Sequence, residues 1–357
     1  MSNSHWSKSS LKSLTSRIGD GIHGTPKYVE RSNYPFINGN NLRRGFIEVF
    51  PETKRVSKIE YEKYFIEFDQ NTLFLSINGT LGSLAKYRGE LVILGKSAAY
   101  IKCSAINIDF LYYYLQLPGV QQHMWNVATG STIKNLSLEA IRNLQIPTPS
   151  EDEQQKIAAV LSALDAKIDC NNRINAELEA MAKTLYDYWF VQFDFPFDFA
   201  QGRPDENGKP YKSSGGTMVY NPTLKRDIPA GWEDSNILAV AYLLGGGTPT
   251  KKKSEYWNGA IPFFTPTDAD GTIFKFATAD YITEEGLKKS STKLFEKNTV
   301  FITARGSVGK LVLVGVDMAM NQSCYALRAK PGISHTYLFF LTKELIHHLE
   351  EIGRAHV

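Results

Sequence analysis

The sequence contains little cysteine and no long apolar run. Its three cysteines, Cys103, Cys170 and Cys324, are scattered over 357 residues. An odd number of widely spaced cysteines argues against a disulfide framework or a zinc site and favours a reducing compartment. No segment approaches the ~18 apolar residues of a membrane span, and residues 1–16 lack the apolar core of a signal peptide. We therefore expect a cytoplasmic protein without a metal site or a membrane segment.

Sequence patterns of catalysis are also scarce. The glycine-rich stretch 306–310 has neither the spacing nor the final Ser or Thr of a phosphate-binding P-loop. The stretch 221–224 differs from the Asn-Pro-Pro-Tyr type of motif found in amino-methyltransferases. Pro204 and Asp205 are not followed by the Glu-x-Lys pair of a nuclease motif. We therefore do not expect the chain to catalyse a reaction by itself.

Charge is modest in total but unevenly placed. The net charge is only +3, which is too small to indicate a nucleic-acid partner from composition alone. Residues 1–150 hold 17 basic and 11 acidic side chains, residues 151–190 hold 4 and 8, and the remainder holds 19 and 18. A basic part, an acidic part and a nearly neutral part are typical of a modular binding protein rather than of a uniform enzyme.

The chain repeats itself with a shift of 227 residues. Residues 34–37 match 261–264, residues 71–74 match 298–301, residues 79–82 match 306–309, and residues 110–113 match 337–340. Upstream, residues 24–26 match 247–249 with a shift of 223, and Trp6 matches Trp232 with a shift of 226. Such a period is far too long for a solenoid and indicates two copies of a whole domain.

Each copy contains predicted strands followed by a predicted helix. Apolar runs at 73–77 and 300–303 end at glycine-containing turns, which is typical of strands. Second runs follow at 91–94 and 311–314, and aromatic, helix-like stretches follow at 110–117 and 337–345. We therefore expect each copy to be a mixed α/β or α+β module.

A long helix is expected between the copies. Ser150 and Glu153 form a capping box, which predicts a helix start. Two lines of residues then repeat every seven positions, which is typical of a coiled-coil helix. They are Ile157, Leu164, Asn171, Leu178 and Leu185, and Leu161, Ile168, Asn175, Ala182 and Trp189. At 1.5 Å per residue, a helix over residues 151–190 would span about 60 Å.

The centre of this seam is polar. Buried asparagines at positions 171 and 175 would fix the register and the choice of partner, and the alternative is a bent or locally solvated stretch. The helix is acidic, so it should repel DNA and serve as a spacer and a protein-docking surface. Residues 193–227 are rich in Gly, Pro and Ser, which predicts a loop or linker, and residues 228–232 open the second copy.

Several strings are shared with a known family. They are residues 153–162, 164–165, 168–169 and 185–191 in the helix, 205–216 in the linker, 228–232, and the glycine strings 245–249 and 304–309. Together they resemble the specificity subunit of type I restriction–modification systems. The resemblance covers nearly the whole chain; its helix and linker strings are specific, whereas the glycine strings alone would be weak.

The resemblance implies an α+β protein with two mixed α/β target-recognition domains joined by a long coiled-coil helix. In that family each domain reads one half of a split target in double-stranded DNA, and the helices set the spacing and dock two methyltransferase subunits. Restriction/translocase subunits join for cleavage. The partner subunits are expected to use S-adenosylmethionine, ATP and Mg, and this chain to bind no cofactor. The expected parts are a first recognition domain (1–149), the spacer helix (150–192), the linker (193–227) and an incomplete second recognition domain (228–357).

The second copy departs from the family pattern. Residue 357 corresponds to Gly130 of the first copy, so the rest of the second domain and the family's second helix are expected to be missing, as in a truncated product. The apolar seam then has no partner helix within the chain. Exposed Leu and Ile side chains would favour self-association.

Candidate DNA contacts lie on three pairs of loops. Bases are read by Arg, Lys, Asn and Gln, and phosphates are held by Lys, Arg and hydroxyl groups. One loop of the second copy offers Thr248, Thr250, Lys251, Lys252 and Lys253, and its counterpart in the first copy offers Thr25 and Lys27. An ordinary solvated run of charge is the alternative.

The other two pairs lie after predicted strands. Arg305 and Lys310 flank a tight turn where the first copy has Asn78, and an Arg/Asn difference would suit two modules that read different bases. A plain hairpin is the alternative there. The loop after residues 35–37 offers Asn38, Asn40, Asn41, Arg43 and Arg44, opposite Thr267, Asp268 and Asp270 of the second copy.

Two other functions remain open. A fragment of a fused restriction–methylation enzyme is the enzymatic alternative, which catalytic motifs in flanking reading frames would support. A coiled-coil scaffold without a DNA role is the structural one. Substitution of residues 251–253 and 305 by alanine without loss of DNA affinity would favour the scaffold.

Overall fold

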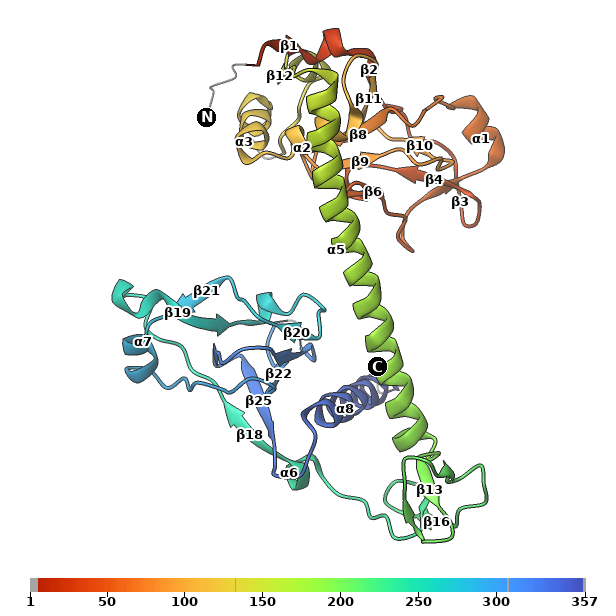
Figure 1. Cartoon of the computed structure of the whole chain (residues 1–357), viewed down its shortest axis with the longest axis vertical. Helices are drawn as coiled ribbons and strands as arrows, with labels where there is room; N and C mark the ends of the chain where they lie inside the picture. The colour runs from red at the N-terminus through yellow and green to blue at the C-terminus, as the bar shows by residue number, and fades with distance from the viewer. Residues whose placement is uncertain (1–5, 132, 307, 356–357) are drawn as a thin grey trace. The chain divides into compact units, whose positions relative to one another are not determined.

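The chain forms two compact units. The computed structural model describes residues 6–131, 133–306 and 308–355, with side chains described up to His347. The units comprise residues 1–174 and 175–357, and the division falls within the long helix α5 (Glu151–Tyr186). Figure 1 shows the elements of each unit in the order of the chain. Among the helices of the described residues, none is both long and apolar enough to cross a membrane.

The first unit is built on a four-stranded sheet that is buried on both faces. Its order is β2 (Thr15–Asp20), β11 (Ala98–Cys103), β8 (Thr72–Ser76) and β9 (Leu84–Lys86), and all its pairs are antiparallel. In the central strand β8, Leu73 and Leu75 enter one core while Phe74 enters another. Successive side chains of a strand point to opposite faces, so this continuous apolar run suits a sheet covered on both sides.

The second sheet of this unit covers one of those faces. Its order is β10 (Ile93–Leu94), β4 (Tyr34–Ile37), β7 (Arg55–Val56) and β3 (Tyr28–Val29). The other face carries helices α2 (Ile108–Leu115), α3 (Pro118–Val127) and α4 (Leu138–Arg142). The remaining elements are β1 (Lys8–Ser10) paired with β12 (Gln145–Pro147), the hairpin β5 (Leu42–Arg43) and β6 (Phe46–Ile47), α1 (Lys58–Lys63), and the 3-10 turns η1 (Leu11–Leu14) and η2 (Gly39–Asn41).

The second unit contains a five-stranded sheet with the same arrangement. Its order is β18 (Ala241–Gly245), β25 (Cys324–Ala329), β22 (Val300–Thr303), β23 (Leu311–Val314) and β20 (Phe274–Lys275). A three-stranded sheet, β21 (Asp280–Ile282), β19 (Trp257–Phe264) and β24 (Ala319–Met320), lies beside it. Its helices and turns are α6 (Ile237–Val240), η4 (Ser254–Tyr256), η5 (Pro266–Asp268), α7 (Glu284–Lys288) and α8 (His335–Ala355).

The duplication expected from the sequence is confirmed by the strand registers. β4 pairs in parallel with β10 through Phe36 opposite Ile93, and β19 pairs in parallel with β24 through Phe263 opposite Ala319. Central strands β8 and β22 run antiparallel to β11 and β25 in matching registers. Topology and register are therefore both repeated, although few side chains are identical.

Two of the matches between the copies differ between the sequence and the structure. β23 corresponds to β9, which sequence reading missed because its Ala85 and Lys86 give little strand signal. Ile22 N donates to Leu94 O at 2.8 Å, and Gly247 N donates to Met320 O at 3.1 Å. Ile22 is thus the counterpart of Gly247 at a shift of 225, whereas the glycine match had given 223. The same shift makes His23 the counterpart of Thr248.

The long helix begins where the capping box predicts. Ser150 N donates to Glu153 Oε2 at 3.0 Å, and Glu153 N donates to Ser150 Oγ at 3.3 Å. Its 36 residues give a length of about 54 Å. Regular α-helix ends at Tyr186, earlier than expected, because a π-helical segment, Asp187–Val191, follows. That segment changes the number of residues per turn, so Trp189 leaves the heptad line.

The stretch expected to be a loop or linker is more ordered than its composition suggests. It contains the sheet β14 (Arg203–Pro204), β13 (Pro196–Asp198), β15 (Lys209–Pro210) and the hairpin β16 (Met218–Asn221) with β17 (Arg226–Pro229). Phe195 stacks on Tyr211 at 4.9 Å and on Trp232 at 5.2 Å between ring centroids. This aromatic cluster provides a small core, and the Gly and Pro residues serve its turns.

Candidate nucleic-acid interface

A polar cleft lies at one corner of the first unit. Three strand ends meet there, because Asp20 at the end of β2 pairs with Ala99, and Ser76 at the end of β8 pairs with Ala98 at the start of β11. The cleft has a volume of about 530 Å³. It is lined by Asp20, His23, Ile77, Asn78, Lys96, Ser97, Asn135, Leu136, Ser137 and Leu138. Amide, ammonium, imidazole and carboxylate groups thus converge on one concave surface.

Ser97 holds two of the predicted loops together. Its hydroxyl donates to Asn38 Oδ1 at 2.9 Å and accepts from Gly39 N at 3.0 Å. Its carbonyl accepts from Ile77 N at 2.9 Å, next to Asn78. The structure therefore brings Asn38 and Asn78, which are 40 positions apart in the sequence, to the same corner.

The corresponding corner of the second unit carries different side chains. Ala304 N donates to Ser323 O at 2.8 Å, as Ile77 N does to Ser97 O, and this places Arg305 where the first unit has Asn78. Thr248 Oγ1 donates to Gln322 Oε1 beside it. Arg305 is exposed and its turn has Gly306 at φ 78, while Ser307 lies outside the described residues. Lys310 Nζ donates to Ala269 O at 3.0 Å.

The lysine loop of the second unit is partly anchored. Lys253 Nζ donates to Tyr256 Oη at 3.1 Å and lies 3.8 Å from Glu255, while Lys251 Nζ lies 5.9 Å from the centre of the Trp257 ring. Lys252 and Thr250 are exposed. The loop thus presents ammonium groups to solvent from a fixed base.

Asn41, one of the predicted contacts, is buried in its own loop. Its side chain is 3% exposed, accepts from Asn38 N at 2.9 Å, and donates to Glu48 O at 2.8 Å and Thr53 Oγ1 at 3.2 Å. Asp268 has the same role in the second unit, where it accepts from Thr265 N at 2.8 Å. Both side chains cap a 3-10 turn, so they shape the loop and have no group left over for a base.

The remaining candidates of the first unit are not among the residues that line the cleft. Arg43 lies over Phe50 at 4.8 Å and near Glu48, and Arg44 forms the turn of the β5–β6 hairpin with φ 48. Thr25, Lys27 and Asn40 are exposed, and Lys27 N donates to Glu60 Oε2 at 3.1 Å.

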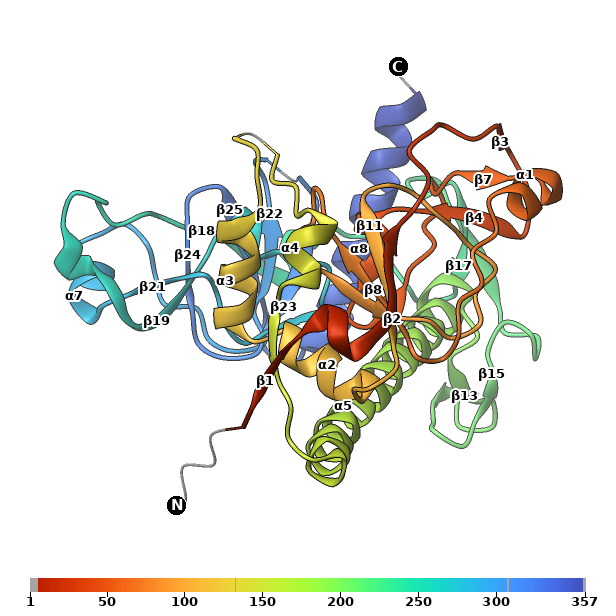
Figure 2. The ribbon, with the colours of Figure 1, turned by 90° about the horizontal axis from the view of Figure 1, so that it is seen from above.

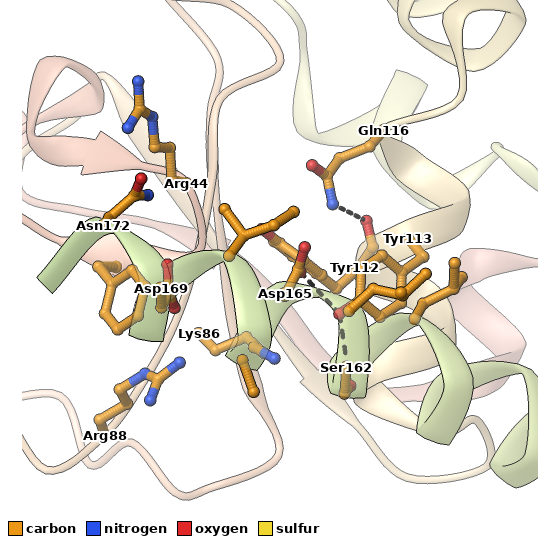
Figure 3. Close-up of a pocket in the computed structure, with 15 residues that line it drawn as sticks. Arg44, Lys86, Arg88, Tyr112, Tyr113, Gln116, Ser162, Asp165, Asp169 and Asn172 are labelled. Carbon is orange, nitrogen blue, oxygen red and sulfur yellow. Dashed lines mark hydrogen bonds between the residues drawn. The ribbon is translucent and has the colours of Figure 1, made fainter. Parts of the chain in front are cut away.

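Arg44 instead lines a groove beside helix α5, which Figure 3 shows. The groove has a volume of about 690 Å³. One wall consists of Arg44, Phe46, Lys86, Arg88, Tyr112, Tyr113 and Gln116, and the other of Leu161, Ser162, Leu164, Asp165, Ala166, Ile168, Asp169 and Asn172. It therefore has basic and aromatic groups on one side, and acidic and apolar groups on the other.

Hydrogen bonds hold the two walls of the groove in place. Tyr113 Oη donates to Asp165 Oδ2 at 2.7 Å, and burial together with that carboxylate raises the pKa of the Tyr113 phenol to about 12. Lys86 Nζ is 2.6 Å from Asp109 Oδ1, and the Arg88 guanidinium stacks at 4.2 Å on Phe46. Arg44, Arg88 and Asp169 keep exposed charges along the rim.

The heptad seam of α5 is largely open to solvent. Ile157, Leu161 and Ala182 are half-buried, whereas Leu164, Ile168, Leu178 and Leu185 are 51–57% exposed. Asn171 and Asn175 are exposed as well. Viewed from above in Figure 2, α5 runs beside α2 in the first unit, and the Tyr113–Asp165 bond joins these two helices.

Sequence reasoning missed most of the polar side chains at the two corners. Asp20, His23 and Lys96 line the first cleft, and Gln322 is bonded to Thr248 in the second unit. They follow or precede strands that lie adjacent only in the folded sheet. The sequence repeat could have indicated two of these positions, because Lys96 and Gln322 lie at matching places just before β11 and β25.

Comparison with known proteins identifies the fold and the family. The chain superimposes on the crystal structure of the type I restriction–modification S subunit from M. genitalium with a TM-score of 0.55 and 16% identity, covering 98% of this chain and 81% of that one. It is therefore a two-module mixed α/β protein with a long helix, and the predicted fold class is confirmed. The family model of the type I restriction modification DNA specificity domain matches residues 3–180 and 229–356. The chain belongs to that family.

Named relatives carry the same description. The type I restriction enzyme MjaIX specificity subunit of Methanocaldococcus jannaschii is 25% identical over 289 residues, which is 78% of this chain and 62% of that protein. The EcoR124I/EcoR124II specificity subunit of Escherichia coli is 28% identical over 248 residues, which is 66% of this chain and 50% of that protein. The chain thus spans between half and two thirds of the length of these relatives.

Proposed function

We propose that this chain is the DNA-binding specificity subunit of a type I restriction–modification complex. Each module reads one half of a bipartite double-stranded target, and helix α5 sets their spacing and docks methyltransferase subunits. In this proposal residues 1–149 and 228–357 are the reading modules, 150–192 the spacer and 193–227 the connection. Methylation and cleavage belong to partner subunits, which supply the S-adenosylmethionine, ATP and Mg chemistry.

The observation that carries the proposal is the pair of equivalent corners with unlike side chains. The same strand ends and the same backbone bonds present Asn78 in one unit and Arg305 in the other. Asn pairs well with adenine and Arg with guanine in the major groove. Two domains with the same backbone but different side-chain hydrogen-bond donors are suited to a DNA target with two different halves.

Selection from random duplexes tests the proposal. The full chain, assembled with the methyltransferase subunits of its system, should enrich a sequence in two fixed parts separated by a constant gap. Affinity should fall steeply with salt, because phosphate neutralisation releases counterions. Equal recovery of all duplexes at every salt concentration would contradict the proposal and favour a scaffold without a DNA role.

The groove beside α5 supports the docking part of the proposal. The apolar residues Leu161, Leu164 and Ile168 of its helical wall have the 3–4 spacing that accepts a second helix. Arg44 and Arg88 on one wall favour an acidic edge on that helix, and Asp165 and Asp169 favour a basic edge. In this proposal Arg44 serves protein docking rather than DNA contact.

Charge reversal tests the docking surface. Arg44→Glu combined with Arg88→Glu should weaken methyltransferase binding about tenfold, because two attractive pairs become repulsive at roughly 0.2–1 kcal/mol each. Titration of the full chain with the methyltransferase subunit measures this. Lys58→Glu, an exposed residue of α1 outside the groove, is the matched control.

The same double variant tests whether a second copy of the chain, rather than a methyltransferase subunit, binds in the groove. If light scattering shows that the free chain is a dimer and the Glu variants turn it into a monomer, the groove and the seam serve self-association instead. Unchanged binding and unchanged mass in the double variant would remove the groove from the docking surface.

A further inference from the structure

The cleft of the first unit contains a negative charge where DNA binding would disfavour one. Asp20 is the one carboxylate among the described residues that line it. Its side chain is 23% exposed, and His23 Nε2, on a side chain that is 74% exposed, lies 2.8 Å from Oδ2. Asp20 ends strand β2 and pairs with Ala99, so its backbone is fixed by the sheet.

A carboxylate in a DNA interface repels phosphate and gains nothing from counterion release. It is favourable only where it accepts a hydrogen bond from a base. In the major groove, cytosine N4 and adenine N6 donate, whereas guanine O6 and thymine O4 are acceptors that repel a carboxylate. An acidic side chain therefore discriminates between amino and keto bases.

The local geometry suits that role. The contact of His23 Nε2 with Oδ2 restrains the Asp20 side chain. Within the described part of the chain, Asp20 Oδ1 makes no hydrogen bond to protein. Asn78 and Lys96 line the same cleft and supply donors for neighbouring groups. Lys96 also offsets the negative charge, which limits the repulsion of DNA by the site.

The second unit lacks this group at the equivalent position. Gly245 pairs with Tyr325 of β25 as Asp20 pairs with Ala99 of β11. A Cβ placed on Gly245 would meet no atom within 4 Å, so the position has room for a side chain. Thr248 stands where the first unit has His23 and is bonded to Gln322. The carboxylate is thus a difference between two otherwise matching corners.

We propose that Asp20, positioned by His23, determines base specificity in the first half of the target by accepting a hydrogen bond from an exocyclic amino group. The ligand class is the amino face of cytosine or adenine in duplex DNA. The inference rests on the proposed function, since it names the chemistry by which that cleft reads DNA.

Asp20→Ala is the direct test, in the full chain assembled with its methyltransferase subunits. Alanine removes the acceptor and adds no donor, so the preference for an amino base at one position of the first half-target should fall roughly tenfold to hundredfold. Affinity for random DNA should stay equal or rise, because one negative charge is removed. Preferences in the second half-target should not change.

Three further variants separate base readout from a structural role. His23→Ala should weaken the same preference partially, and His23→Gln, which keeps a donor, should restore most of it. Gly245→Asp should introduce a preference for an amino base in the second half-target. Glu62→Gln, on an exposed side chain of α1, is the control for loss of an acidic group.

The possible results distinguish failure of the Asp20 inference from failure of the proposed function. An equal loss of affinity at all positions, or a lowered melting temperature with unchanged preferences, would overturn the role of Asp20 in specificity. Failure of the unmodified chain to select any sequence would instead overturn the proposed function itself. Loss of preference at one position, with the same melting temperature as Glu62→Gln, supports the inference.

Discussion

Tyr186→Ala is expected to destabilise the second unit by about 3–5 kcal/mol, the usual cost of removing a buried aromatic ring. Tyr186 is the last residue of α5 and is 7% exposed. Its ring centroid lies 5.7 Å from that of Phe340 and 5.3 Å from that of Phe190, and its core includes Val300. Burial raises the pKa of the Tyr186 phenol, so the side chain remains neutral at ordinary pH.

Urea unfolding followed by tryptophan fluorescence would measure the effect, since Trp257 belongs to the same unit. Tyr186→Phe keeps the ring and should cost less than about 1.5 kcal/mol. Leu164→Ala removes an exposed apolar group from the same helix and should cost little. Equal stability of Tyr186→Ala and the unmodified chain would show that α5 is not anchored through this core.

Arg305→Ala is expected to abolish most discrimination at one guanine position of the second half-target, with a loss of about 1–3 kcal/mol. Arg305 is exposed on the turn after β22, and its loss leaves the base edge without its bidentate partner. The effect should appear as a change of preference at one position, measured by selection from partly randomised duplexes.

Lys252→Ala provides the contrast. An ammonium group that contacts a phosphate should weaken binding to all sequences alike and reduce the slope of log affinity against log salt by roughly 1. Asn78→Ala should alter only the first half-target. If Arg305→Ala behaves like Lys252→Ala, Arg305 holds the backbone and does not read a base.

Local patterns in the sequence predicted the elements with strong signals. Consecutive apolar residues in β8 and β22 and the Ser150–Glu153 cap were interpreted correctly, and the aromatic stretch 110–117 indicated a helix that the structure places at Ile108–Leu115. These signals are short-range, because burial of a strand and capping of a helix depend on residues a few positions apart. The duplication was also readable, since two copies on one scaffold keep their spacing.

Signals that depend on distant contacts were missed. The sheet at 196–210 was expected to be a linker, although alternating Phe residues from 193 to 199 could have indicated a strand. The burial of Asn41, whose side chain bonds within its own loop, was likewise not readable from the sequence. Polar residue type alone does not distinguish a base-reading amide from a capping one, because both need a loop.

The sequence by itself determined the duplicated architecture, the long helix with its seam and the family. Only the tertiary structure decided which candidate residues lie close together. It brought Asn38, Asn78, Asp20 and Lys96 to one corner and turned Arg44 toward helix α5. The physical reason is that heptads, caps and repeats are periodic along the chain, whereas a site depends on which strand ends the sheet pairing sets side by side.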